Sequence, residues 1–194
     1  MAVNDIIVCM RITGGNARGF GLRVPKITDI RPAQEMVRLA VYSILGDKVR
    51  DAELLDLYAG SGSFGIEALS RGAKFATFID SNPVAVQAIE TNLKNARFWG
   101  KSKVVKQDAV MFMTEDHNYY DIIFVCPPYS YGFPKALFYH ITEHLKPDGI
   151  VIFDHAKTTT FNKHTEGLEV IDQRSYGASG VTFFKLAEDV EESE

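Results

Sequence analysis

The sequence predicts an α/β fold with a seven-stranded, mostly parallel sheet, and three observations support this prediction. Short apolar runs alternate with helical stretches between Glu53 and Asp154, which is typical of a parallel sheet covered on both faces. A glycine-rich loop joins the first of these runs to the helix that follows it. The last two apolar runs have no helical stretch between them, so we expect a C-terminal antiparallel hairpin.

The start of the chain predicts a small N-terminal β-hairpin extension. Two short strands, Met10–Thr13 and Phe20–Val24, flank a flexible connection at Gly14–Gly19. Pro32 then stands at the favoured first position of a helix. The apolar face of this helix follows from a spacing of three and four residues and consists of Val37, Ala40, Val41, Ile44 and Leu45.

The alternation of strands and helices begins after this first helix. The predicted strands of the sheet are Leu54–Tyr58, Phe75–Asp80, Val104–Lys106, Ile122–Val125, Ile150–Asp154, Leu168–Arg174 and Val181–Leu186. The predicted helices between them are Phe64–Ser70, Pro83–Phe98, Val110–Thr114 and Pro134–Leu145. We therefore divide the chain into an N-terminal arm (1–30), a main α/β domain (31–187) and an acidic tail (188–194).

The composition is that of a globular protein, and the charge is unevenly distributed. The 194 residues are 46% hydrophobic and 24% charged, which excludes disordered, collagen-like and coiled-coil chains. The net charge of −4 argues against a nucleic-acid partner. Five acidic residues, however, lie within 188–194, and residues 1–187 carry 21 positive and 20 negative charges. A nucleic acid bound locally by a basic region is therefore still compatible with the sequence.

The sequence shows no pattern of a metal site, a disulfide framework or a membrane-spanning segment. Cys9 and Cys126 show neither a metal-ligand spacing nor a disulfide framework, so we expect no metal. No apolar run approaches the length of a membrane span, and the N-terminus lacks the pattern of a signal peptide. We expect a cytoplasmic protein without a membrane partner.

The most informative segment is the glycine loop after the first strand of the sheet. Its candidate cofactor-binding residues are Ala59, Gly60, Ser61 and Gly62. Gly60, Gly62 and Gly65 spell G-x-G-x-x-G, and Asp80 follows Gly60 by 20 residues at the end of the next strand. Backbone N–H groups of such a loop approach a ligand closely, and the acid can hold ribose hydroxyls. The pattern alone fits both NAD and S-adenosylmethionine.

Two further acids extend this candidate cofactor site. Asp56 lies inside the strand, where it would accept from the ammonium group of a methionine moiety and repel a pyrophosphate, which favours S-adenosylmethionine. Asp108 and Ala109 end the third strand in the same layer, where the carboxylate could accept from an adenine amino group. Asp108 is equally well placed to be the N-cap of the short helix after it, and both roles are compatible.

The candidate catalytic segment follows the fourth strand and consists of Cys126, Pro127, Pro128 and Tyr129. Ligands of open α/β sheets bind beyond the carboxyl ends of the strands, so this loop faces the same crevice as the glycine loop. Consecutive prolines fix the backbone and aim its carbonyl groups rigidly. Tyr129 offers a flat ring on which a base can stack.

These motifs together resemble a known family. Four motifs, in their order along the chain, resemble those of the Rossmann-like class I S-adenosylmethionine-dependent amino-methyltransferases. They are Asp56-x-x-Ala59-Gly60-Ser61-Gly62, Asp80, Asp108-Ala109 and Pro127-Pro128-Tyr129. A more selective set is Met10–Gly15, Arg31-Pro32, Val37-Arg38 and Glu67–Gly72. This set resembles the bacterial 16S ribosomal RNA guanine-N2 methyltransferases of the small subunit. The resemblance runs from Met10 to about Leu186.

The resemblance implies a methyl transfer and its partners. In that family an Asp or Asn before Pro-Pro, with the neighbouring backbone carbonyl, accepts both hydrogens of the guanine amino group. The aromatic residue after Pro-Pro stacks on the base, and the N-terminal hairpin reaches toward RNA. The resemblance therefore implies S-adenosylmethionine as methyl donor, 16S ribosomal RNA or an assembling small subunit as partner, and a monomeric enzyme.

The sequence departs from the family at two positions. Cys126 stands where the family has its acid, and a thiol is a weak acceptor that is mostly protonated at neutral pH. Either the Pro127 carbonyl suffices, or Cys126 is tuned toward the thiolate, or activity is impaired. Met36 stands where the family usually has a basic residue.

The candidate RNA contacts are the arginines near the N-terminus, namely Arg11, Arg18, Arg23, Arg31 and Arg38. Arginine suits phosphate because of its bidentate fork, although a solvated surface with ion pairs explains scattered basic residues as well. Three other functions are compatible with parts of the sequence: an RNA-binding or assembly factor with reduced catalysis, a methyltransferase of another base such as cytosine, and an NAD oxidoreductase.

Overall fold

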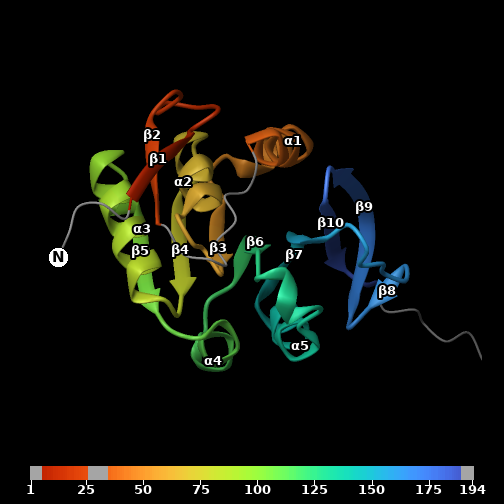
Figure 1. Cartoon of the computed structure of the whole chain (residues 1–194). Coiled ribbons are helices and arrows are strands. Elements are labelled where there is room, and N and C mark those ends of the chain that lie inside the picture. The colour runs from red at the N-terminus through yellow and green to blue at the C-terminus, as the bar shows by residue number, and fades with distance from the viewer. Residues whose placement is uncertain (1–5, 26–34, 189–194) are drawn as a thin grey trace, which may run out of the picture.

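The computed structural model describes residues 6–25 and 35–188 (Figure 1). A two-stranded sheet is formed by β1 (Ile6–Arg11) and β2 (Gly21–Pro25), and an eight-stranded main sheet has the order β5-β4-β3-β6-β7-β10-β9-β8. The strands of the main sheet are β3 (Glu53–Leu57), β4 (Phe75–Asp80), β5 (Ser102–Lys106), β6 (Tyr120–Val125), β7 (Leu145–Ala156), β8 (His164–Thr165), β9 (Leu168–Tyr176) and β10 (Ser179–Leu186). The α-helices are α1 (Glu35–Leu45), α2 (Ser63–Ser70), α3 (Pro83–Asn95), α4 (Ala109–Glu115) and α5 (Lys135–His144).

The main sheet confirms the predicted α/β architecture. The strands β5, β4, β3, β6 and β7 run parallel, and β10 inserts antiparallel between β7 and β9. The sheet has one strand more than the seven predicted, because His164–Thr165 pairs with the start of β9. A strand of two residues is too short to show an apolar period, so the sequence does not reveal it.

Helices cover both faces of the main sheet. Figure 1 shows α1, α2, α3 and the β1–β2 hairpin on one side of the sheet and α4 and α5 on the other. The side chains of β3 alternate accordingly, since Leu54 packs in the core cluster of α1–α3 and Leu55 in the cluster of α4 and α5. Among the described residues, none of the helices is long and apolar enough to cross a membrane.

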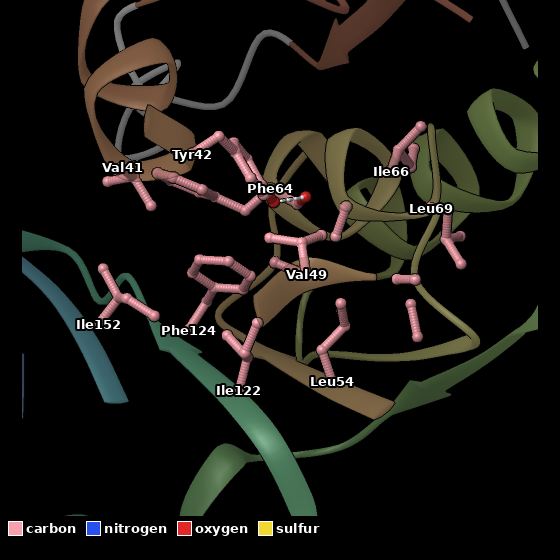
Figure 2. Close-up of a cluster of buried hydrophobic side chains, with 14 of the residues drawn as sticks. Val41, Tyr42, Val49, Leu54, Phe64, Ile66, Leu69, Ile122, Phe124 and Ile152 are labelled. Carbon is pink, nitrogen blue, oxygen red and sulfur yellow. Dashed lines mark hydrogen bonds between the residues drawn. The ribbon is translucent and has the colours of Figure 1, made fainter. Parts of the chain in front are cut away.

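The core beneath α1 and α2 combines aromatic rings with aliphatic side chains (Figure 2). Phe64 stacks on Phe124 with ring centroids 5.0 Å apart. Tyr42 packs against Phe124 and donates a hydrogen bond from its hydroxyl to the Phe64 carbonyl. The buried face of α1 differs from the prediction: Ile44 is 41% exposed, whereas Arg38 and Tyr42 are buried.

The β1–β2 hairpin is packed onto the main domain. Its buried side chains, Met10, Ile12, Leu22 and Val24, belong to the core cluster of α1–α3. The connection Gly14–Gly19 contacts the end of α2 through hydrogen bonds. The Asn16 N–H donates to the Ser70 carbonyl at 2.8 Å, and the Ser70 hydroxyl donates to the Gly14 carbonyl at 2.6 Å.

Candidate active site

The predicted site residues meet at the carboxyl ends of β3, β4 and β6. The glycine loop leaves β3, Asp80 ends β4, and Cys126 follows β6. The two loops approach each other through Tyr58 and Tyr131, whose rings stand edge to face with centroids 6.2 Å apart. The structure thus brings together the glycine loop, Asp80 and the Cys-Pro-Pro-Tyr segment.

The glycine loop needs backbone conformations that most residues avoid. Gly60 and Gly62 have φ of +59° and +75°, and Tyr58, just before the loop, has φ of +59°. A left-handed conformation at a bulky residue stores strain, which is common at functional sites. The Asp80 carboxylate accepts from the Gly60 N–H at 2.8 Å, and the Asn92 side chain donates to the Ser61 carbonyl at 2.9 Å. Neighbouring elements therefore hold the loop in place.

Asp56 lies beneath the loop and is 1% exposed. Its carboxylate accepts from the Gly65 N–H at 2.9 Å, which ties β3 to the first turn of α2. A side chain at Gly65 would collide with the Phe78 ring, so glycine is required for this close approach. Burial raises the pKa of Asp56 to about 8, with a further contribution from the charge of Asp80. In the structure, Asp56 thus positions the start of α2 through Gly65. Its contact with the ammonium group of a methionine moiety stays a prediction.

Asp80 and Asp108 border the loop from two sides. Asp80 is half-buried, and its carboxylate also accepts from the Asn82 N–H at 2.9 Å. Burial raises its pKa. Asp108 is the N-cap of α4, as predicted, and its carboxylate accepts from the N–H groups of Val110 and Met111 at 2.9 and 3.1 Å. Burial raises the pKa of Tyr58 to about 12, and the charge of Asp108 adds to this effect. Asp108 therefore lies close to the loop.

Cys126 is a half-buried free thiol. Burial raises its pKa well above the usual range, and the charges of Asp154 and Asp56 add to this effect. A backbone hydrogen bond from Asp154 acts in the opposite direction without reversing it. The thiol therefore stays protonated at neutral pH, which argues against the predicted alternative of a tuned thiolate.

Tyr129 is fixed by its hydroxyl group. It begins a short 3-10 turn at Tyr129–Tyr131, and its Oη lies 3.0 Å from Oδ1 of Asp154 and 2.7 Å from Oγ of Ser179. Asp154 lies near the end of β7, and Ser179 begins β10. The ring that the sequence predicts as a stacking platform thus has a defined orientation.

Sequence reasoning missed several residues of this region, namely Tyr58, Asn92, Tyr131, Asp154 and Ser179. One of them carried a usable signal: Asp154 ends an apolar strand, as Asp80 does at the end of β4. Ser179 and Asn92 carried none, because their contacts come from segments far apart in the chain.

The predicted RNA-binding arginines divide into two groups. Arg11, Arg18 and Arg23 are exposed on the hairpin. Arg31, like the predicted helix start Pro32, lies outside the described residues. The prediction that Arg38 contacts RNA is wrong, because its side chain is fully buried and therefore does not form part of an RNA-binding surface.

Arg38 instead joins α1 to the hairpin and to α2. Its Nη2 donates to the Arg11 carbonyl at 2.7 Å, and its Nε lies 3.7 Å from the Glu67 carboxylate. Glu67 also accepts from the Thr13 N–H at 2.9 Å and forms an ion pair with Arg71 at 2.9 Å. The motif residues of the hairpin and of α2 thus dock one on the other.

Three histidines gather in space away from the predicted site. His117, His140 and His144 line a hollow of about 390 Å³ between α4 and α5, near the amino ends of β6 and β7. Within 6–25 and 35–188 no group of three or more His, Cys, Asp or Glu residues is arranged to hold a metal ion. This hollow contains none of the predicted site residues.

The sheet order and the two loops at its carboxyl edge define the Rossmann-like class I methyltransferase fold. The Escherichia coli protein yhhF, described as a candidate methyltransferase, matches this fold with a TM-score of 0.81 at 27% identity, over 91% of this chain and 97% of its own. The chain belongs to the family described as conserved hypothetical protein 95, whose model matches residues 10–185.

Two relatives carry names that refer to ribosomal RNA. Bacillus subtilis YlbH, named as a candidate rRNA methyltransferase, is 30% identical over 181 residues, which is 91% of this chain and 98% of YlbH. The ribosomal RNA small subunit methyltransferase D of Escherichia coli K12 is 37% identical over 123 residues, which is 63% of this chain and 62% of that protein.

Proposed function

We propose that this protein is a cytoplasmic enzyme that methylates ribosomal RNA of the small subunit. Its substrate would be the exocyclic amino group of a guanine in 16S ribosomal RNA, and S-adenosylmethionine would donate the methyl group. One observation carries the proposal: the glycine loop with Asp80 and the Cys-Pro-Pro-Tyr segment meet at one edge of the sheet. The name of the Escherichia coli relative supports the choice of small-subunit RNA.

The residues around the glycine loop fit S-adenosylmethionine. The half-buried Asp80 carboxylate, held by the N–H groups of Gly60 and Asn82, has the acceptor oxygens that ribose hydroxyls require. Asp108 lies close to Tyr58 at the other side of the loop and would accept from the adenine amino group. The residues that would hold the methyl donor are thus Asp56, Ala59, Gly60, Ser61, Gly62, Asp80, Asp108 and Ala109.

The protein's part in the reaction is to position a poor nucleophile. A methyl sulfonium is already a strong electrophile, whereas the lone pair of a guanine amino group is delocalised into the ring. Holding the two in line supplies much of the rate enhancement. The Pro127 carbonyl, fixed between Cys126 and Pro128, would accept one amino hydrogen, and the Tyr129 ring would stack on the base.

The exposed arginines of the hairpin supply the expected RNA contacts. Arg11, Arg18 and Arg23 are exposed on an element that is hydrogen-bonded to the end of α2. Few phosphate contacts predict modest affinity for naked RNA and a salt dependence confined to these residues.

The decisive experiment is methyl transfer from labelled S-adenosylmethionine to undermethylated small subunits, followed by mapping of the modified nucleoside. We expect one labelled N2-methylguanine in 16S ribosomal RNA. Label on another base would overturn the guanine assignment, and absence of label despite binding of S-adenosylmethionine by calorimetry would overturn the catalytic one.

A specific observation favours a second candidate, an RNA-binding or assembly factor with reduced catalysis. The Cys126 thiol stays protonated, so it is a weaker acceptor than the acid of related enzymes. The same protonation argues against cytosine methylation through a thiolate nucleophile. A fluorinated cytosine substrate would trap a covalent adduct only if the protein methylated cytosine through a Cys126 thiolate.

A further inference from the structure

We propose that Asp154 is a catalytic residue that replaces the missing acid of the Cys-Pro-Pro-Tyr segment and accepts a hydrogen of the target amino group. The inference rests on the proposed function, because it needs an amino group as the methyl acceptor. It deepens that function by assigning the acceptor to a residue outside the motif.

The sheet register brings Asp154 next to Cys126. The strands β6 and β7 are parallel neighbours, and Val125 pairs with Phe153, so the chain continues with Cys126 on one strand and Asp154 on the other. The charge of Asp154 acts on the thiol of Cys126, which requires the two groups to be close. Asp154 is half-buried at the carboxyl edge of the sheet, where the site lies.

A hydrogen-bonded chain orients the carboxylate. A phenol has a single proton and an ionised carboxylate can only accept, so the chain runs from the Ser179 hydroxyl to Tyr129 Oη and from there to Asp154 Oδ1. The two contacts measure 2.7 and 3.0 Å. A carboxylate has several acceptor positions, so one group can accept from the Tyr129 hydroxyl and from further donors. The proposed stacking ring and the proposed acceptor are therefore held by one network.

The step balances with this carboxylate as base. The amino nitrogen attacks the methyl carbon, the carbon–sulfur bond breaks, and its electron pair stays on sulfur as a neutral thioether. The methylated nitrogen then carries a positive charge and releases a proton to the Asp154 carboxylate, which later passes it to water. Before transfer, the hydrogen bond from the amino group to Asp154 localises the nitrogen lone pair, which the protonated Cys126 thiol does poorly.

The test is Asp154→Asn in the full chain, assayed with labelled S-adenosylmethionine and undermethylated small subunits. Asn retains an acceptor for the Tyr129 hydroxyl and removes the base. We expect kcat to fall about 100-fold, the usual range for a positioned acid or base. The dissociation constant for S-adenosylmethionine and the Tm should stay at the wild-type values. An unchanged kcat in an otherwise active protein would overturn the inference.

Two controls separate the chemical part of Asp154 from a structural one. Asp116→Asn makes the same change in a second carboxylate that accepts a tyrosine hydroxyl, that of Tyr120 at 2.8 Å, at the amino end of β6 and thus at the opposite end of the strands from the site. It should leave kcat at the wild-type value. Tyr129→Phe removes the contact with Asp154 but retains the ring, and it should lower kcat less than tenfold. A loss as large as that of Asp154→Asn would assign Asp154 to positioning alone.

Rescue provides the sharpest outcome. Adding Cys126→Asp to Asp154→Asn returns a carboxylate to the adjacent strand end, so we expect the double variant to recover most of the lost kcat. A double variant as slow as Asp154→Asn would contradict an acceptor shared between the two strand ends. If the wild-type protein transfers no methyl group to small subunits, the proposed function fails first and this inference with it.

Discussion

The N-terminal hairpin and the Cys-Pro-Pro-Tyr segment are both held by polar contacts, but the contacts differ in depth. The Arg38–Glu67 pair that fastens the hairpin to α1 and α2 is fully buried. Tyr129, Asp154 and Ser179, which fix the segment after β6, are only half-buried and lie at the edge of the sheet. The first network removes charges from solvent to dock an element, whereas the second leaves acceptors accessible to a ligand. In these two networks, burial therefore separates the ion pair that docks the hairpin from the three residues at the edge of the sheet that a ligand can reach.

The largest effect is expected from breaking the buried network. Glu67→Gln leaves Arg38 charged and buried while removing its ion-pair partner, and Arg71 also loses a contact of 2.9 Å. We expect the free energy of unfolding to fall by about 3–5 kcal/mol in urea titrations. Glu53→Gln is the control, since Glu53 pairs with exposed Lys74 and should cost less than about 1 kcal/mol. Equal losses would show that burial does not set the difference.

A smaller loss should follow from lifting the hairpin loop off α2. Gly15 has φ of +76°, and a Cβ there would lie 1.8 Å from the Ser70 carbonyl oxygen. Gly15→Ala should therefore destabilise the protein by about 2–3 kcal/mol in the same titration. Gly19→Ala, with φ of +84° but open space around the Cβ, should cost only about 1 kcal/mol. The pair separates collision from backbone strain.

Asp56 gives a prediction in pH. Its pKa of about 8 exceeds that of an unfolded aspartate, so its stabilising contribution is complete at low pH and is lost as the pH rises toward 8. Asp56→Asn retains an acceptor for Gly65 and does not titrate. The stability of the variant relative to wild type should thus increase by roughly 1–2 kcal/mol between mildly acidic and mildly basic pH. A difference that does not change with pH would contradict the raised pKa.

The segment after β6 should tolerate the family's own residue. Cys126→Asp introduces a stronger acceptor, so we expect methyl transfer to stay at the wild-type rate or rise a few-fold. The gain is limited because a second carboxylate beside Asp154 would raise the pKa of one of the two. Initial rates with small subunits measure the effect, and a large loss would show that the thiol is specifically required.

The smallest effect is expected from the acidic tail. Deleting residues 188–194 removes five acidic groups, of which the exposed Glu188 is paired with Lys185 at 2.9 Å. Activity and Tm should both stay close to the wild-type values, because surface pairs contribute little. Loss of turnover would overturn the division of the chain into an N-terminal arm, a main domain and an acidic tail.

Most of the fold could be predicted from local sequence, because strands in a doubly covered sheet are short apolar runs. The bounds of β4 agree with the predicted Phe75–Asp80. The beginning of β7 was missed, since Leu145 to Gly149 includes Lys146, Pro147 and Asp148, which do not follow an apolar pattern. The order of β9 and β10 could not be predicted either, because it depends on pairing across the sheet.

Part of the candidate site could be predicted from the same strand pattern. Gly60, Asp80 and Cys126 follow parallel strands, whose carboxyl ends meet at one edge, so their convergence follows from the strand pattern. Arg38 was misassigned because an arginine near the N-terminus reads as a phosphate contact, while its partner Glu67 lies 29 residues further on. No local pattern distinguishes a buried arginine from an exposed one.

The position of β10 between β7 and β9 has a consequence for biosynthesis. β10 is the last described strand to be synthesised, yet its first residue, Ser179, completes the hydrogen-bonded chain that holds Tyr129. A nascent chain that ends before this strand has both loops of the site but lacks the anchor of the ring. The Tyr129 ring therefore acquires its contact with Ser179 only after β10 has been synthesised and paired between β7 and β9.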